Sequence, residues 1–158
     1  MKFGIISDTH GSLPAAVHTA FAGVEHIIHA GDIGGQCILE ELELIAPVTA
    51  VTGNNDYFED YLTVAQSVRI TLDGTRFFIT HTPERALRSL RGYGDIPAGG
   101  PLPHVCIHGH THTPRDEYAG VVRMLCPGSP VRPRNSGPTV LILEATNGQV
   151  HSLDFVRT

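Results

Sequence analysis

The segment KFGIISDTH (residues 2–10) sets the architecture of this chain, because it joins a buried strand directly to a polar loop. Residues 3–7 are almost continuously apolar, which is typical of a strand that other elements cover on both faces. Asp8 and His10 stand at the carboxyl end of this strand, where α/β folds place their ligand sites. A carboxylate and an imidazole two residues apart at a strand end can turn toward the same point. The segment therefore predicts a polar site at the end of the first strand.

Four similar clusters follow along the chain, each after a short run rich in β-branched or aromatic residues. They are Gly31-Asp32, Gly53-Asn54-Asn55-Asp56, Thr80-His81 and Gly109-His110-Thr111-His112. Five loops that carry metal-binding side chains at strand ends are hard to explain by chance. We therefore take seven residues as candidate metal ligands, namely Asp8, His10, Asp32, Asn54, His81, His110 and His112.

The first half of the chain alternates strands and helices. Apolar periodicity predicts helices over residues 13–22 and 36–45, and strands over residues 25–30 and 48–52. Ser12 is the expected N-cap of the first helix, in whose first turn Pro14 is tolerated. This βαβαβ order favours a parallel sheet with right-handed crossovers.

The second half is richer in strands. Asp73-Gly74 predicts a type I′ hairpin between strands over residues 67–72 and 76–80. A helix over residues 84–91 and a Gly/Pro-rich surface loop or lid over residues 92–103 follow. The last strands are expected over residues 105–108, 117–125, 139–144 and 149–155, with Asn147-Gly148 joining the final two. A single domain (residues 1–158) of the α+β or α/β class, with two mixed sheets and helices outside, fits better than one doubly wound sheet.

Composition narrows the functional class. At 158 residues the chain can bury a core without disulfides, and no apolar run reaches the roughly 18 residues of a membrane helix. The first strand leaves no room for a signal peptide, and the three cysteines show no Cys-x-x-Cys spacing, so we expect a reducing, cytoplasmic location. The net charge of −5 offers no footprint for nucleic acid, whereas ten histidines against eleven Lys plus Arg point to metal.

The candidate ligands suit a pair of metal ions. Asp32 stands alone in its loop and is the obvious bridge, because a carboxylate has two oxygens and enough charge to offset two cations. Asn54 offers a neutral amide oxygen, which leaves positive charge for an anionic substrate. Nitrogen and oxygen ligands without thiolate suit Mn, Fe, Zn, Ni or Co rather than a structural zinc site.

The five clusters, in this order, resemble the calcineurin-like metallophosphoesterase superfamily, whose pattern is Asp-x-His, Gly-Asp, Gly-Asn-His-Asp/Glu, His and Gly-His-x-His. Residues 126–130 (CPGSP) resemble the Asn-Pro-Gly-Ser turn of its small single-domain phosphodiesterases. The resemblance implies a four-layer αββα sandwich and two divalent metal ions, with Mn²⁺ the first choice. It places Asp8, His10, Asp32 and His112 around one ion, and Asp32, Asn54, His81 and His110 around the other.

Asn55 is the main departure from this family, most of whose members have a histidine there. In many members that histidine contacts the phosphate and protonates the leaving alkoxide. Asn55 can bind a phosphoryl oxygen but cannot supply a proton near neutral pH. Asp56 is expected to orient Asn55 or a ligand histidine. A second departure is Thr82-Pro83, where relatives often show Gly-His.

The expected activity is a two-metal hydrolysis of small or nucleotide-like phosphodiesters, with a metal-bridging hydroxide as the nucleophile. Asp32, Asn54, Asn55 and Asp56 are the expected catalytic residues. A phosphomonoesterase or protein phosphatase, and a non-catalytic metal-binding scaffold on the same fold, are the alternatives. The expected partner is a small phosphoester, without membrane or nucleic acid, and assembly into a homo-oligomer stays open.

Other polar residues are expected to have structural or solvated roles. Arg85, Arg88 and Arg132 could pair with a phosphate, although exposed arginines are usually only solvated. His29 and His108 are expected to be packed inside, whereas surface positions are expected for His18, His26, His104 and His151. Asp95 and Glu59-Asp60 are interpreted as solvated loop charges, and Cys106 and Cys126 as small buried hydrophobes.

Overall fold

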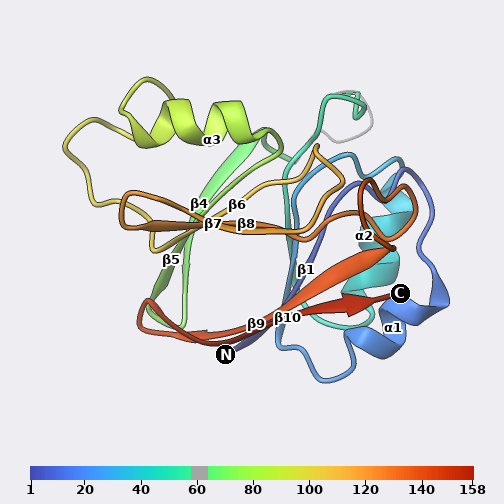
Figure 1. Cartoon of the computed structure of the whole chain (residues 1–158). Coiled ribbons are helices and arrows are strands. Elements are labelled where there is room, and N and C mark those ends of the chain that lie inside the picture. The colour runs from blue at the N-terminus through green and yellow to red at the C-terminus, as the bar shows by residue number, and fades with distance from the viewer. Residues whose placement is uncertain (58–63) are drawn as a thin grey trace.

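The computed structural model describes residues 1–57 and 64–158, which form two five-stranded sheets packed face to face (Figure 1). Glu59-Asp60, interpreted above as solvated loop charge, lie outside the described residues. The first sheet has the strand order β10-β9-β1-β2-β3, and the second has the order β4-β5-β6-β8-β7. Both sheets combine parallel and antiparallel pairs, as the change of pattern along the sequence predicts.

The first sheet is built around the N-terminal strand. β1 (Lys2–Ile6), β2 (His26–His29) and β3 (Val48–Ala50) are parallel, and their connections carry α1 (Ala15–Ala20) and α2 (Gln36–Glu43). β9 (Thr139–Thr146) and β10 (Gln149–Arg157) extend this sheet antiparallel on the other side of β1. The βαβαβ unit expected for the first half is therefore confirmed.

The second sheet centres on two parallel pairs. β5 (Thr75–Thr80) lies beside β6 (Val105–Ile107), which lies beside β8 (Val122–Cys126). Antiparallel neighbours close the two edges, namely β4 (Ser67–Leu72) and β7 (Arg115–Ala119). The helix α3 (Pro83–Leu90) covers the outer face of this sheet, and α1 and α2 cover the outer face of the first sheet (Figure 1). The order of layers is helices, sheet, sheet, helix.

Three apolar clusters hold these layers together. Between the sheets, Phe3 packs edge-on against Phe77 with ring centroids 5.0 Å apart. Phe21 belongs to the cluster under α1 and α2, and Phe78 to the cluster under α3. Since Phe77 and Phe78 are consecutive in β5, the alternation of side chains along a strand supplies both faces of the sheet. Cys106 and Cys126 are buried, as expected for small hydrophobes. The αββα sandwich is confirmed.

Two details of the expected elements are wrong. Residues 117–125 do not form one strand but the hairpin of β7 and β8, which turns at Gly120. Gly120 has a φ of 62°, and this single glycine supplies the turn without a stronger local signal. Ser12 is not the N-cap of α1: Pro14 holds that position and makes no side-chain capping bond. Ser12 instead donates its backbone N–H to the carbonyl of Thr9, so it belongs to the polar loop after β1.

The expected turns of the two hairpins are confirmed. Asp73 and Gly74 have φ values of 46° and 71°, and Asn147 and Gly148 have values of 50° and 79°. Positive φ at both central residues is the mark of a type I′ turn. Within the part of the chain that the structure describes, no helix has the length and apolar character that crossing a membrane requires.

Candidate metal centre

All seven candidate ligands follow parallel strands and lie at the carboxyl ends of β1, β2, β3, β5 and β6. The parallel pairing continues into the loops, because Asp8 donates its backbone N–H to Gly31 (2.9 Å) and His10 donates to Asp32 (3.0 Å). In the other sheet, Gly109 donates in the same way to His81 (2.9 Å). Both sheets therefore direct their polar loops to the same edge of the sandwich.

The first group of ligands consists of Asp8, His10, Asp32 and His112, whose ligand atoms all lie within 4.8 Å of one another. Asp8 Oδ1 is 3.1 Å from His112 Nε2. His10 Nε2 is 3.5 Å from His112 Nε2 and 3.8 Å from Asp32 Oδ2. The structure thus brings together the four residues that the resemblance assigns to one ion.

The second group consists of Asp32, Asn54, His81 and His110. His81 Nε2 lies 3.4 Å from Asp32 Oδ1, and His110 Nδ1 lies 3.0 Å from Asn54 Oδ1. The rings of His81 and His110 meet edge to face with centroids 5.2 Å apart. Asp32 belongs to both groups, and its two oxygens point to different histidines.

Backbone carbonyls set the tautomers of two ligand histidines. His81 Nδ1 lies 2.8 Å from the carbonyl of Ala30, and His112 Nδ1 lies 2.6 Å from the carbonyl of Arg132. A carbonyl oxygen only accepts, so each Nδ1 carries the proton and each Nε2 keeps a lone pair directed into the site.

Two buried atoms at the centre have no hydrogen-bond partner among the described residues, Asp8 Oδ1 and His81 Nε2. A buried carboxylate oxygen and a buried imidazole nitrogen without partners are costly in a folded protein. A cation beside each atom, one in each ligand group, would satisfy both, so the residues present fit divalent metal ions with nitrogen and oxygen ligands.

The two carboxylates differ in their electrostatic environment. Burial raises the pKa of Asp8, and the hydrogen bond from Ser7 and the nearby histidines offset only part of this effect. Burial also acts to raise the pKa of Asp32, but the adjacent His81 ring and two hydrogen bonds from Asn55 outweigh it and hold the pKa well below its usual range. Asp32 is therefore kept ionised by its neighbours, whereas Asp8 lacks the positive partner that its burial calls for.

Strained backbone is concentrated at these ligands. Asp8, His10, Asp32, His110 and His112 all have positive φ, between 46° and 68°. The left-handed region is unfavourable for residues with a side chain, by about 1–2 kcal/mol each. The strain is held by the loop hydrogen bonds, including one from the His110 N–H to Asp8 Oδ2 (3.1 Å). The loops are thus built to keep these side chains in place before a ligand arrives.

The glycines of the motifs make room for a neighbouring carboxylate. A Cβ on Gly53 would stand 2.1 Å from Asp32 Oδ1, and a Cβ on Gly109 would stand 2.8 Å from Asp8 Oδ2. Each glycine precedes a candidate ligand in its own loop and admits a ligand from another loop. The pairing of Gly with Asn or His in these clusters therefore has a steric origin.

Asn55 and Asp56 form hydrogen bonds with the ligand loops and not with each other. Asn55 donates to Asp32 twice, from its backbone N–H to Oδ1 (2.9 Å) and from its amide Nδ2 to Oδ2 (2.6 Å). The Asp56 carboxylate accepts the backbone N–H groups of Ile33, Gly34 and Gly53 at 2.8–3.0 Å. Asp56 therefore ties the loop after β2 to the loop after β3. The sequence analysis expected it to orient Asn55 or a ligand histidine instead.

Several residues support the loop after β1 through contacts that the sequence alone does not reveal. Ser7 Oγ shares its one proton between Asp8 Oδ2 (2.7 Å) and the carbonyl of Gly128 (2.9 Å), and Ser129 Oγ donates to the carbonyl of Asp8 (2.8 Å). The segment with the Pro-Gly-Ser turn therefore holds the loop after β1 from the opposite sheet. His29 is buried, as expected. Its ring lies 2.9 Å from Oγ1 of Thr9, the residue between the candidate ligands Asp8 and His10.

The expected arginine candidates separate into different environments. Arg85 and Asp95 form a bidentate ion pair with distances of 2.7 and 3.1 Å. The expectation that Asp95 is a solvated loop charge is therefore wrong. Arg88 is exposed on α3 and donates to the carbonyl of Tyr93 (2.8 Å). Arg132 lines the depression over the ligands, together with Arg134, which the sequence analysis missed.

The remaining histidines are mostly structural. His108 is buried with its ring near the carbonyl of Gly109, as expected. His18, His26 and His104 are half-buried rather than on the surface, because their rings contact Glu41, Thr49 and the backbone N–H of Arg76. His151 is exposed, as expected.

Comparison with known proteins indicates the same family as the sequence motifs. Residues 1–148 match the model of the calcineurin-like phosphoesterase superfamily domain. The chain is 36% identical to a probable metallophosphoesterase of Methanothermobacter thermautotrophicus, covering all of this chain and 93% of that protein. It is 31% identical to a phosphodiesterase of Methanocaldococcus jannaschii, over 91% of this chain and 93% of that protein.

Solved structures share the fold. The solved structure of an archaeal phosphodiesterase superposes with a TM-score of 0.76 at 27% identity, over 99% of this chain and all of that one. The Vps29 protein of Entamoeba histolytica, solved with zinc, has a TM-score of 0.76 at 18% identity, over all of this chain and 98% of that one, and shows the fold alone. The chain therefore belongs to the calcineurin-like phosphoesterase superfamily, whose curated relatives here are named as metallophosphoesterases and phosphodiesterases, hydrolases that act on phosphoester bonds.

Proposed function

We propose that this protein is a phosphodiesterase that hydrolyses small or nucleotide-like phosphodiesters with the help of two divalent metal ions. Membership of the superfamily and two relatives of matching length, one of them named a phosphodiesterase, support the reaction class. Mn²⁺ is the first candidate, with Fe, Zn, Ni and Co as others that suit nitrogen and oxygen ligands. The substrate is a small phosphoester, and the reaction takes place at the edge where the loops of both sheets meet.

The observation that carries the two-ion proposal is the position of Asp32. Its Oδ1 lies 3.4 Å from His81 Nε2, and its Oδ2 lies 3.8 Å from His10 Nε2. One carboxylate thus presents a separate oxygen to a histidine of each ligand group. This is the arrangement that a bridging carboxylate requires, and Asp32 is the residue that both groups share.

The seven candidate ligands would form two metal sites that share Asp32. Asp8, His10 and His112 would hold one ion with Asp32, and Asn54, His81 and His110 would hold the other. When bound, divalent ions lower the pKa of a water molecule and polarise the phosphoryl oxygens of an ester. Asn54 is a neutral ligand, so Asp32 is the one carboxylate in the second group. The positive charge that this leaves on the ion favours an anionic substrate.

Asn55 determines which esters this site can cleave well. Its amide already donates to Asp32 Oδ2, and it has no proton to give to a leaving alkoxide near neutral pH. General acid catalysis typically contributes a factor of about 10²–10⁴ where the leaving group is poor. The site is therefore suited to diesters whose leaving group departs without a proton.

The test follows hydrolysis during a metal titration. Mn²⁺ is added to chelator-treated protein, and turnover of bis(p-nitrophenyl) phosphate is compared with turnover of p-nitrophenyl phosphate. We expect activity to saturate at two ions per chain and the diester to be preferred by about tenfold or more in kcat/KM, a difference of about 1.4 kcal/mol. The His81→Gln variant should lose this activity, while Arg88→Gln, an exposed change on α3, should keep it.

The alternatives predict different outcomes. A phosphomonoesterase would prefer the monoester under the same conditions. A non-catalytic scaffold would bind two ions in calorimetry yet turn over neither ester. Saturation at one ion per chain with full activity would contradict the bridging role of Asp32.

A further inference from the structure

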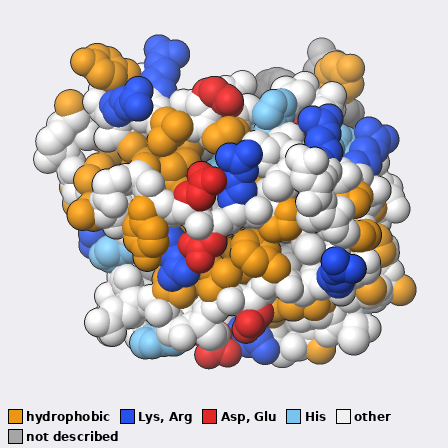
Figure 2. Space-filling model, in the orientation of Figure 1, with side chains coloured by type: hydrophobic (Ala, Val, Ile, Leu, Met, Phe, Trp, Pro, Cys, Tyr) orange, Lys and Arg blue, Asp and Glu red, His pale blue; other side chains and the backbone are white. Residues whose placement is uncertain are grey.

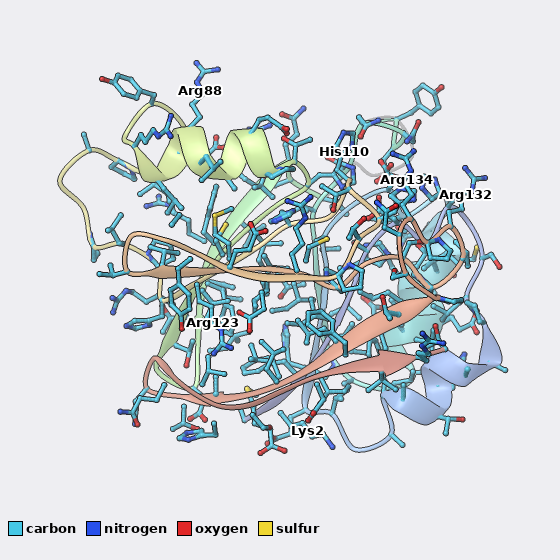
Figure 3. The ribbon with its side chains drawn as sticks, in the orientation of Figure 1. Lys2, Arg88, His110, Arg123, Arg132 and Arg134 are labelled. Carbon is cyan, nitrogen blue, oxygen red and sulfur yellow. The ribbon has the colours of Figure 1, made fainter. Side chains whose placement is uncertain are left out.

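A depression of about 430 Å³ lies directly over the candidate ligands and carries two arginines on its rim. His10, Asn55, His110 and His112 contribute to its floor and walls, and residues 132–134 (Arg-Pro-Arg) form its other side. Figure 3 places Arg132 and Arg134 on the same side of the molecule as His110. Figure 2 shows basic side chains gathered beside a histidine on this part of the surface. Both arginines therefore line the depression in which a ligand at the metal centre would lie.

The backbone of both arginines is fixed to the loop that carries the ligands. The carbonyl of Arg132 accepts from His112 Nδ1 (2.6 Å), and its N–H donates to Ser129 Oγ (2.9 Å). Arg134 donates its N–H to the carbonyl of His112 (2.9 Å), and its own carbonyl accepts from Thr113 Oγ1 (3.0 Å). The two side chains therefore start from positions that are set relative to the metal centre.

No ion pair among the described residues occupies the guanidinium groups of this pair. Among the residues that the structure describes, the arginines in ion pairs are Arg85, Arg115 and Arg123, whereas Arg132 and Arg134 make none and are exposed. An exposed arginine on a rigid backbone, next to a site for an anionic substrate, can bind phosphate through two parallel hydrogen bonds.

The charges of the site indicate which part of a substrate this pair would meet. Asp8 and Asp32 are the two carboxylates among the candidate ligands, and they offset half of the charge of two divalent ions. One hydroxide nucleophile and the single negative charge of a diester would balance the remaining two positive charges, so the reacting group does not need the arginines. A terminal phosphate carries a charge of about −1.5 to −2 at pH 7, which matches two guanidinium groups.

We propose that Arg132 and Arg134 bind a second phosphate of the substrate, so that the preferred substrates are phosphodiesters that also carry a terminal phosphate. This inference rests on the proposed phosphodiesterase function and narrows its substrate class. The two arginines act in specificity: they hold the distal phosphate while the diester lies at the metal centre.

The experiment uses two diesters that differ only in the second phosphate. Thymidine 5′-(p-nitrophenyl phosphate) and the same compound with a 3′-phosphate share one leaving group. The kcat/KM of each is measured at saturating Mn²⁺ for the wild type, Arg132→Gln, Arg134→Gln, the double variant, and Arg88→Gln as a charge-matched control. Calorimetry with thymidine 3′,5′-bisphosphate and with thymidine 5′-monophosphate provides a readout that needs no turnover.

We expect the wild type and Arg88→Gln to prefer the 3′-phosphorylated diester. Each arginine substitution should lower the ratio of the two kcat/KM values by about tenfold, and the double variant should lower it further, since charged hydrogen bonds are lost. Calorimetry should show tighter binding of the bisphosphate, and the double variant should lose this difference.

The outcomes separate this inference from the proposed function. If both diesters turn over but the ratio is the same in wild type and double variant, the second phosphate is not bound here, although the phosphodiesterase function stands. If the double variant loses activity on both diesters equally, the arginines act on the reacting phosphate and the inference is wrong. If neither diester turns over but the bisphosphate still binds through the arginines, the proposed activity fails and the binding site stands. If neither turnover nor a binding difference is found, both are wrong.

Discussion

At the scale of single residues, the metal centre depends on a few side chains whose local situation is unfavourable without a cation. Asp8 shows this most clearly: it is fully buried, its Oδ2 is satisfied by Ser7, and its Oδ1 has no partner among the described residues. Its pKa is raised because burial opposes the charged form. The residues around the centre therefore favour ligand binding at some cost to the stability of the metal-free protein.

Asp8→Asn tests this trade between stability and binding. In the metal-free protein an amide nitrogen at the place of Oδ1 could donate to His112 Nε2, now 3.1 Å away, so the variant should be as stable as wild type or more stable by about 1 kcal/mol. Mn²⁺ at 100 times its Kd should stabilise the wild type by about 2.7 kcal/mol and the variant by much less. Urea unfolding with and without Mn²⁺ measures both, with Asp154→Asn on β10 as the control. An unchanged Mn²⁺ effect in Asp8→Asn would exclude Asp8 as a ligand.

Asn55 leads to a prediction about leaving groups. Without a protein acid, kcat/KM for a series of aryl diesters should fall steeply as the pKa of the leaving phenol rises. Asn55→His introduces an imidazole that can donate a proton, so the slope should become shallower. Asn55→Ala, which has no proton donor, should keep the steep slope. A shallow slope in the wild type, with chemistry shown to limit the rate, would mean that another group donates the proton.

At the scale of elements, the loops after the strands are built as interlocking pairs. The loop after β3 places Gly53 against Asp32, and Asp56 fastens it to the loop after β2. The loop after β6 places Gly109 against Asp8. Because each loop fits around a carboxylate of another, a small change in one loop displaces ligands that belong to a different strand.

Gly53→Ala should reveal this coupling. Its Cβ would stand 2.1 Å from Asp32 Oδ1, so the loop must shift. Overpacking of this kind costs about 1–3 kcal/mol of stability, and we expect Mn²⁺ affinity to fall by about 10–100-fold through the displaced Asp32. Calorimetry with Mn²⁺ measures the loss. Gly137→Ala is the control, because its Cβ would meet only the far end of Arg157 at 3.3 Å; equal affinities for the two variants would contradict the model of interlocking loops.

The ion pair of Arg85 and Asp95 joins α3 to the loop that follows it. The hydrogen bond from Arg85 lowers the pKa of Asp95 in the folded state. A lowered pKa adds stability above the unfolded pKa of about 3.9, and this stability is lost as the pH falls through the folded pKa. Both side chains are about one-third exposed, so solvent screening limits the pair to about 0.5–1 kcal/mol.

A double-mutant cycle of Arg85→Gln and Asp95→Asn measures this contribution by urea unfolding. The coupling energy should be present at pH 7 and should disappear at a pH well below the normal range of an aspartate. A coupling that stays constant over this range would show that charge is not its source.

At the scale of the whole molecule, the metal centre connects the two sheets. Asp8, His10, Asp32 and Asn54 follow strands of the first sheet, whereas His81, His110 and His112 follow strands of the second. A bound ion would therefore link two sheets that otherwise meet through the apolar cluster around Phe3 and Phe77.

Metal loading should stabilise both sheets together. Mn²⁺ at about 100 times its Kd should raise Tm by roughly 5–10 °C, and a chelator should reverse the change. Hydrogen exchange should slow in the loops after β1 and β2 and also in those after β5 and β6. Protection confined to the loops of one sheet would mean that the ion does not bridge the sandwich.

Much of this arrangement could be predicted from local patterns. The apolar run of residues 3–6 predicts a covered strand, and Asp73-Gly74 and Asn147-Gly148 predict their hairpins because only a few residues tolerate positive φ. The single turn at Gly120 was missed, since one glycine between two runs of strand-forming residues has no distinctive signal. The roles of Asp56 and Asp95 were also missed, because the partners of Asp56 lie on other loops and the partner of Asp95 lies on α3.

The sequence by itself determined the alternation of elements, the family and the types of side chain at the ends of the strands, because these depend on short-range periodicity and on motifs in a fixed order. Only the tertiary structure decided that Asp32 presents one oxygen to His81 and the other to His10, and that Arg132 and Arg134 border the same depression. The reason is physical: backbone propensities act over a few residues, whereas these contacts join loops from two separate sheets and exist only once both sheets have packed.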